Sequence, residues 1–253
     1  MSVAWSPDGA EIATGSYFPD VLVWDPMTGD LKRRLEGHDK WLEQVVYSPD
    51  GRYLASGDWG ETFILWDAKT GDEIRRFAIK DALEIIGLSF HPTKPMLAAG
   101  SFLNGVAAVV SIDTGEIVKE VRPNNPMFAA YSPDGRYIAF AGDGEGARIN
   151  VFDAESLESV AKFQGHEKCV VALSFTDDGS KMLSCADDGT VRLWDFPSGK
   201  PLKVWDYGHY WVVFCSMIPG RDRFLTADTD GAVRLFRSIG TSRSKNTTCT
   251  TTG

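Results

Sequence analysis

The sequence is poor in the residues on which several classes of function depend. Only four cysteines occur in 253 residues (Cys169, Cys185, Cys215 and Cys249), and they form no C-x-x-C pair and no other metal-ligand spacing. Three of them lie inside apolar, strand-like runs, where a free cysteine behaves as a small hydrophobic residue. We therefore expect buried thiols and not disulfides, no metal site, and a reducing compartment, the cytoplasm.

Long apolar runs and positive charge are scarce as well. No segment reaches the roughly 18 consecutive apolar residues that a membrane helix needs, and residues 1–15 hold charged and turn-forming residues where a signal peptide would carry its apolar run. The 26 Lys and Arg stand against 35 Asp and Glu, which gives a net charge of −9. Because an acidic surface repels phosphate backbones, we do not expect a nucleic acid as the partner, and the lack of a long apolar run argues against a membrane.

What the sequence does contain is an internal repeat. Three copies of Ser-Pro-Asp-Gly begin at Ser6, Ser48 and Ser132, and degenerate versions occupy the matching places in three further units. Each copy is followed by a second landmark, which is aromatic in all units but one: Trp24, Trp66, Val110, Phe152, Trp194 and Phe236. Successive landmarks are 42, 44, 42, 42 and 42 residues apart. A constant period of this length is typical of repeat architectures.

Each repeat has the pattern of strands and not of helices. Apolar, β-branched and aromatic runs of four to six residues alternate with turns rich in Pro, Gly and Asp. In Ser-Pro-Asp-Gly the proline fixes φ for a turn, and the glycine takes the left-handed position. Four short antiparallel strands in about 42 residues make one blade of a β-propeller.

The repeat units resemble those of the WD-repeat family. Trp24-Asp25, Trp66-Asp67 and Trp194-Asp195 match the dipeptide after which the family is named, and Gly37-His38, Gly165-His166 and Gly208-His209 match its Gly-His pair. The resemblance implies an all-β fold, a β-propeller of six four-stranded blades over residues 1–238. The units span about 1–38, 39–80, 81–124, 125–166, 167–208 and 209–238, and the Ser/Thr-rich residues 239–253 are expected to form a disordered tail.

The last blade is expected to be incomplete. A sequence fit for an outer strand follows each of the first five units, but the sixth is followed only by Ser238-Ile239-Gly240 and the polar tail. The last blade should therefore have three strands, or the six blades should form an open or truncated ring. Open blade edges would favour self-association.

The resemblance also implies a hydrogen-bonded set of His, Ser or Thr, Asp and Trp within a blade. The fifth unit matches completely with His166, Ser184, Asp188 and Trp194, and the sixth has His209, Thr226 and Asp230 with Phe236 in place of the indole. The second unit has His38, Ser56 and Trp66, but Gly60 stands where the Asp would be. The role of such a set is structural, since it satisfies polar groups that are costly to bury.

A catalytic triad is the competing interpretation of a His-Ser-Asp set. A hydrolase would need an exposed serine facing a cleft, whereas Ser184 lies in strand sequence and its set ends in a core tryptophan. Three of the four histidines belong to Gly-His pairs, and His91 occupies a turn. We therefore expect no catalytic residue, no cofactor and no metal. Catalysis by paired carboxylates stays open, because no spacing among the 35 acidic residues selects a pair.

Once the motif residues are assigned to the fold, function is expected on loops. Family geometry places aromatic side chains from several blades on one loop face: Tyr17, Phe18, Trp41, Trp59, Phe102, Tyr210 and Trp211. Aromatic side chains gathered on one face are typical of an interaction surface, although several could instead pack under neighbouring loops. The leading hypothesis is a non-catalytic scaffold that binds a protein or peptide there. The alternatives are the sensor fragment of a larger signalling protein and a carboxylate-dependent propeller enzyme.

Overall fold

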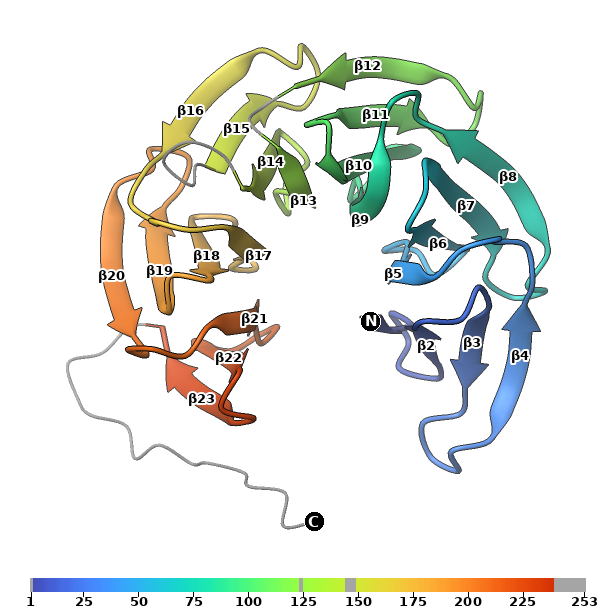
Figure 1. Cartoon of the computed structure of the whole chain (residues 1–253), viewed down its shortest axis with the longest axis horizontal. Helices are drawn as coiled ribbons and strands as arrows, with labels where there is room; N and C mark the ends of the chain where they lie inside the picture. The colour runs from blue at the N-terminus through green and yellow to red at the C-terminus, as the bar shows by residue number, and fades with distance from the viewer. Residues whose placement is uncertain (1, 123–124, 144–148, 239–253) are drawn as a thin grey trace. The chain divides into compact units, whose positions relative to one another are not determined.

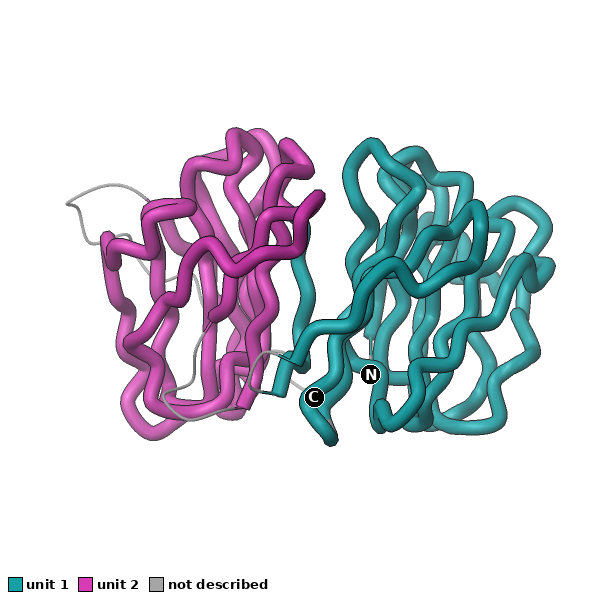
Figure 2. Tube along the Cα trace, turned by 90° about the horizontal axis from the view of Figure 1, so that it is seen from above, with its two compact units in different colours: residues 1–131 teal, residues 132–253 magenta. Residues whose placement is uncertain are grey.

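The computed structural model describes residues 2–122, 125–143 and 149–238, and every regular element in these ranges is a strand. The predicted tail, 239–253, lies outside the described residues. Contacts divide the chain into two compact units, Met1–Tyr131 and Ser132–Gly253 (Figure 2). The boundary falls between the first two strands of the fourth sheet.

The first unit contains strands β1 to β13 (Figure 1). They are β1 (Ser2–Trp5), β2 (Ile12–Gly15), β3 (Val21–Trp24), β4 (Leu31–Leu35), β5 (Leu42–Tyr47), β6 (Tyr53–Asp58), β7 (Thr62–Asp67), β8 (Glu73–Ala78), β9 (Leu83–Phe90), β10 (Met96–Leu103), β11 (Ala107–Ser111), β12 (Ile117–Val121) and β13 (Pro126–Tyr131).

The second unit contains strands β14 to β23. They are β14 (Tyr137–Gly142), β15 (Ile149–Asp153), β16 (Ser159–Phe163), β17 (Val170–Phe175), β18 (Lys181–Ala186), β19 (Thr190–Asp195), β20 (Pro201–Asp206), β21 (Val212–Met217), β22 (Arg223–Asp228) and β23 (Val233–Arg237).

Consecutive strands pair antiparallel into six sheets, each a four-stranded meander except the last. The sheet β21-β22-β23 has three strands, so the predicted six-bladed all-β propeller with an incomplete last blade is confirmed. Among the first five sheets, the pairing of the third with the fourth strand shifts register at the same place, directly before the landmark residue. The landmark thus marks a bulge that turns the outer strand.

The repeated turns are closed by short polar side chains. In the second blade the Ser48 hydroxyl lies 2.6 Å from Asp50 Oδ1, and Gly51, at φ 71°, donates its N–H to the Ser48 carbonyl. At the other turn of this blade, Asp67 Oδ1 accepts the backbone N–H groups of Lys69 and Thr70 at 2.9 and 2.8 Å. These backbone hydrogen bonds lower the pKa of Asp67 because they favour its charged form. The Asp of the Trp-Asp dipeptide therefore stabilises the turn into the outer strand.

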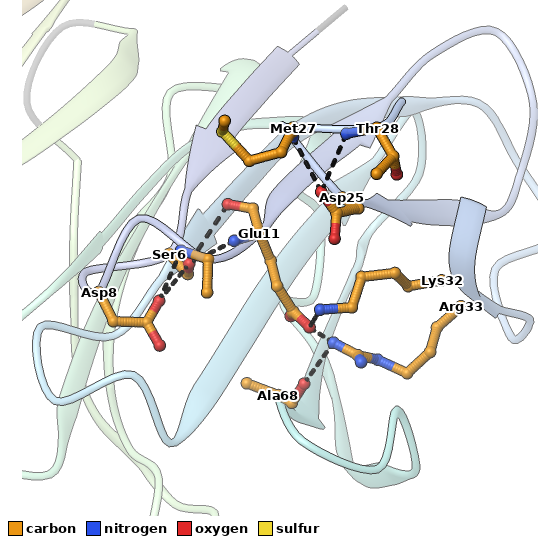
Figure 3. Close-up of polar contacts among 10 residues, drawn as sticks. Ser6, Asp8, Glu11, Asp25, Met27, Thr28, Lys32, Arg33 and Ala68 are labelled. Atoms are coloured by element: carbon orange, nitrogen blue, oxygen red, sulfur yellow. Dashed lines mark hydrogen bonds and ion pairs between the residues drawn. The ribbon is translucent and has the colours of Figure 1, made fainter. Parts of the chain in front are cut away.

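The first blade shows the same turn chemistry together with an ion-pair network (Figure 3). Asp25 Oδ1 accepts the N–H groups of Met27 and Thr28, while Glu11 pairs with Lys32 and Arg33. Burial raises the pKa of Glu11, but the hydrogen bonds from Arg33 and Lys32 outweigh it and lower the pKa overall. Arg33 also donates to the Ala68 carbonyl at 3.0 Å, which ties the first sheet to the second.

The core of each unit lies between successive sheets. One face of the first sheet packs on the second through a cluster that includes Val21, Val23, Leu42 and Val45. Inner strands approach closely at glycines: a Cβ on Gly87 would stand 2.2 Å from the Met127 carbonyl oxygen, where no side chain fits. Burial of these apolar faces stabilises each sheet pair by about 25 cal/mol per Å² removed from water.

The third strand of the last blade begins with a residue that is more exposed than its counterparts in the other sheets. This residue is Val233, which is 45% exposed. The residues that occupy this position in the other sheets are all 0% exposed: Val21, Phe63, Ala107, Ile149 and Val191.

Candidate partner-binding surface

The hydrogen-bonded set in the fifth blade is continuous and buried. His166 Nδ1 lies 3.0 Å from Asp188 Oδ2, His166 Nε2 lies 2.7 Å from Ser184 Oγ, and the Trp194 indole N–H donates to the same hydroxyl oxygen at 2.8 Å. Ser184 is 0% exposed. Burial lowers the pKa of His166, and the hydrogen bonds from His166 and Thr190 lower that of Asp188 despite burial. A serine without solvent access cannot attack a substrate, so this set holds the blade together.

The second blade corrects the assignment made from sequence. His38 Nε2 contacts Ser56 Oγ at 2.7 Å and Trp66 donates to it at 2.8 Å, but His38 Nδ1 also meets a carboxylate, Asp58 Oδ2, at 2.8 Å. The expectation that Gly60 leaves this blade without its Asp was therefore wrong. Asp58 reaches the histidine from the end of β6, and its other oxygen accepts the Gly60 N–H at 2.8 Å. The glycine makes room, since a Cβ there would lie 3.0 Å from that oxygen.

In the sixth blade the hydrogen-bonded set also differs from the one assigned from sequence. His209 is exposed, and the Thr226 hydroxyl lies 2.8 Å from the phenol oxygen of Tyr207. Asp230 does not reach a histidine but accepts from Arg234 at 2.7 Å, and Arg234 also pairs with the buried Asp228. The cause is loop length. Three positions separate His209 from the start of its inner strand, against four for His38 and His166, a difference that could have been read from the sequence.

In the first unit the structure brings three of the predicted aromatic side chains together. The rings of Tyr17 and Trp41 meet edge to face with centroids 5.2 Å apart, and those of Trp41 and Trp59 are tilted by 37° at 5.3 Å. We call Tyr17, Trp41 and Trp59 the aromatic triad. Their side chains are 58%, 45% and 44% exposed, so the rings contact one another at the surface and not in the core.

Backbone hydrogen bonds hold the loops of the triad in place. The Trp41 carbonyl accepts the Trp59 N–H at 2.9 Å, and the Ser16 carbonyl, next to Tyr17, accepts the Leu42 N–H at 2.9 Å. One bond joins the Tyr17 loop to Leu42, the first residue of β5, and the other joins the Trp59 loop to the residue that precedes β5. The triad is therefore presented by paired backbone, which reduces the entropy lost when a partner binds.

The remaining predicted aromatic residues are placed less uniformly. Phe18 is 69% exposed beside the triad, whereas Phe102 is half-buried on β10. In the second unit, Tyr210 and Trp211 are 49% and 52% exposed, and the Trp211 carbonyl accepts the Thr229 N–H at 3.0 Å, as the Trp41 carbonyl accepts that of Trp59.

Sequence reasoning missed two exposed apolar residues next to Trp211. Val213 and Phe214 in β21 are 47% and 49% exposed. Their signal was the run Val212-Val213-Phe214, in which no polar residue alternates with the apolar ones. Such a run indicates a strand that has an apolar side chain on both faces.

Other kinds of site find little support in the described ranges. There, no group of three or more His, Cys, Asp or Glu is arranged to hold a metal ion. No helix in these ranges is long and apolar enough to cross a membrane. Two carboxylates have a raised pKa beside acidic neighbours. Burial and then the charge of Glu43 raise the pKa of Glu84, and burial together with the charges of Asp143 and Asp188 raises that of Asp187.

Comparison with known proteins agrees with this architecture. A family model described as the IFT122 first beta-propeller matches residues 1–252. The solved "Structure of U3-55K" superposes with a TM-score of 0.84 over 93% of this chain and 76% of that one, at 19% identity, which shows the fold alone.

Two curated relatives carry names that refer to pre-mRNA processing and to a small nucleolar RNA. Pre-mRNA-processing factor 19 homolog 2 of Arabidopsis thaliana is 27% identical over 190 residues, 73% of this chain and 35% of that protein. The U3 small nucleolar RNA-associated protein 15 homolog of Xenopus tropicalis is 30% identical over 105 residues, 38% of this chain and 20% of that protein. The chain thus spans about a third or less of the length of these relatives. With six repeats, their Trp-Asp turns and a family match over nearly the whole chain, the protein belongs to the WD-repeat β-propellers, in the family of the IFT122 first beta-propeller.

Proposed function

We propose that this protein is a non-catalytic interaction module that binds a protein or peptide partner through the loop face bearing the aromatic triad. One observation supports this most: three large aromatic rings, all more than 40% exposed, contact one another on loops held by backbone hydrogen bonds. Interaction hot spots are enriched in Trp and Tyr. Exposed apolar clusters are otherwise unfavourable in water.

The hydrogen-bonded sets also support a binding role over catalysis. His38 and His166 are buried among their own blade's residues, and the serine that each contacts is 0% exposed. We further propose a reducing compartment, the cytoplasm, because Cys185 and Cys215 are buried as free thiols.

The test is selection of peptides from a random twelve-residue phage library on the immobilised full chain. Selected peptides are then measured against the double variant Trp41→Ala with Trp59→Ala. We expect the double variant to lose at least tenfold in affinity while its melting temperature stays within a few degrees of the parent, since exposed anchors contribute little to folding.

The matched control is Trp5→Ala. Trp5 is 58% exposed but stands at the opposite end of the first blade, where β1 pairs with Ile12. It should leave binding unchanged. Equal losses for Trp5→Ala and the double variant, or peptides that bind the double variant as well as the parent, would show that the loop face is not the binding surface.

A further inference from the structure

The surroundings of the triad carry an excess of negative charge. The three loop segments that hold it, 16–20, 39–43 and 58–61, contain five carboxylates and one ammonium group: Asp20, Asp39, Glu43, Asp58, Glu61 and Lys40. Asp20 and Asp58 are paired, with Arg34 at 2.6 Å and His38 at 2.8 Å. Asp39 and Glu61 are exposed at the rim.

Arg76 faces the same loops, because it donates to the Gly37 carbonyl at 2.7 Å. The hydrogen bond to Glu73, and then the charges of Asp39 and Asp58, raise its pKa. With Arg34, Lys40 and Arg76 counted, the five carboxylates still outnumber the cations. Burial raises the pKa of Glu84, and the charge of Glu43 in one of these segments raises it further.

The faces of the triad rings are not occupied by the chain's own cations. In five places a Lys or Arg of this protein stands over an aromatic ring, as Arg52 does over Tyr53 at 5.2 Å and Lys203 over Trp205 at 4.7 Å. Among the described residues, none stands over a ring of the triad in this way. The ammonium of Lys40 lies instead next to Gly60, 3.4 Å from where its Cβ would be.

Aromatic rings that are surrounded by carboxylates favour a cation as their ligand. The face of an indole or phenol ring is electron-rich and attracts a cation within about 6 Å of its centroid. Nearby carboxylates add attraction at longer range, on the scale of a Debye length. A nucleic-acid base could stack on the same rings, but its phosphates would meet the carboxylates.

Resting on the binding function proposed above, we propose that the aromatic triad binds a lysine or arginine side chain of the partner, with Asp39 and Glu61 attracting its positive charge. The partner segment is therefore basic. Its cation lies over the rings of Trp41 and Trp59, and its flanking residues meet the acidic rim.

The experiment is a double-mutant cycle on a peptide that depends on the triad for binding. Each Lys or Arg of the peptide is replaced in turn by norleucine, which keeps the aliphatic stem and removes the charge. On the parent protein, replacement of the anchoring residue should weaken binding between about fivefold and thirtyfold, the range of a partly to well desolvated cation–π contact. On Trp41→Ala with Trp59→Ala the same replacement should change binding by less than twofold. This cycle separates a ring contact from general attraction to an acidic protein.

A second variant tests the rim without touching the rings. Asp39→Asn with Glu61→Gln should weaken the parent peptide several-fold and reduce the dependence of affinity on salt, with no change in melting temperature. The inference is overturned, and the binding function stands, if peptides bind through the triad yet norleucine replacement costs the same on the parent and the ring-deleted protein. A twelve-nucleotide single-stranded RNA that binds the parent but not the ring-deleted variant would also overturn it. Peptides that ignore the triad altogether overturn the binding function itself.

Discussion

Replacing Asp188 by alanine removes the carboxylate on which the fifth blade's hydrogen-bonded set depends. Asp188 Oδ2 lies 3.0 Å from His166 Nδ1 and accepts the Glu167 N–H at 2.9 Å, while Oδ1 accepts the Thr190 N–H at 2.8 Å. The two backbone donors lie near the surface and regain water, whereas the His166 side chain is 1% exposed and can turn only to the Thr190 hydroxyl, 3.1 Å from its Nδ1. Hydrogen bonds to a charged group contribute about 1.5–3 kcal/mol, and the Thr190 hydroxyl offsets part of this loss by accepting the His166 N–H.

We therefore expect the free energy of unfolding to fall by about 1–3 kcal/mol, which corresponds to a melting temperature lower by roughly 2–6 °C for a chain of this size. Urea unfolding at pH 7 followed by tryptophan fluorescence measures the loss. Hydrogen exchange locates it, since the amides of Glu167 and Thr190 donate directly to this carboxylate and should lose their protection.

Asp187, the preceding residue, is the matched control. Burial raises its pKa, so the folded protein disfavours its charged form. Asp187→Ala should leave stability at pH 7 within about 0.5 kcal/mol of the parent or slightly above it. Equal losses for the two neighbouring aspartates, or unchanged exchange at Glu167 and Thr190 in Asp188→Ala, would refute the structural role assigned to this set.

Three further outcomes are expected. Because the folded-state pKa of Asp188 is depressed, its stabilisation is present above the unfolded value of about 3.9 and is lost as pH falls further, so parent and Asp188→Ala should converge in stability in acid titrations followed by circular dichroism. Gly87→Ala should cost about 3 kcal/mol or more, because the new Cβ would meet a backbone carbonyl oxygen at 2.2 Å, whereas Gly9→Ala, at φ 71° with nothing within 4 Å, should cost about 1 kcal/mol in urea unfolding. Tyr207→Phe should lose about 1 kcal/mol with its hydrogen bond and His209→Ala almost nothing; a larger loss at His209 would restore the family assignment.

The fold could be predicted from the sequence because its signals are local and repeated. Each Ser-Pro-Asp-Gly or Trp-Asp segment specifies its own turn through a hydroxyl or carboxylate two or three residues away, as Ser48 and Asp67 do. Six such segments at one period leave little choice of architecture. The three-stranded last blade could also be predicted, since a polar sequence follows β23 where the first five units continue with strand sequence.

The hydrogen-bonded sets were harder to predict, because a carboxylate or hydroxyl group can reach the histidine from a sequence position other than the one that the motif aligns. Asp58 brings its carboxylate to His38 from two residues earlier than the aligned position, which is possible because Gly60 leaves the space empty. A loop shorter by one residue moves His209 to the surface, and a tyrosine reaches the threonine instead. Alignment by motif assigns a residue to a backbone position. A change of one residue in loop length is enough to prevent the side chain at that position from making the expected hydrogen bond.

The two ends of the blades differ in a way that bears on function. At one end, four of the six units close the turn with the same hydroxyl-to-carboxylate contact, at Ser6, Ser48, Ser132 and Thr176, so these side chains are committed to the fold. At the other end the corresponding loop positions hold Trp41, Cys169 and Trp211, whose carbonyls all accept the same backbone hydrogen bond. Because that bond uses only main-chain atoms, the side chain at this position is free to vary without cost to the turn. In such a fold the side chain at this loop position can differ from blade to blade while the turn stays the same. Trp41 of the aromatic triad occupies this position in the second blade.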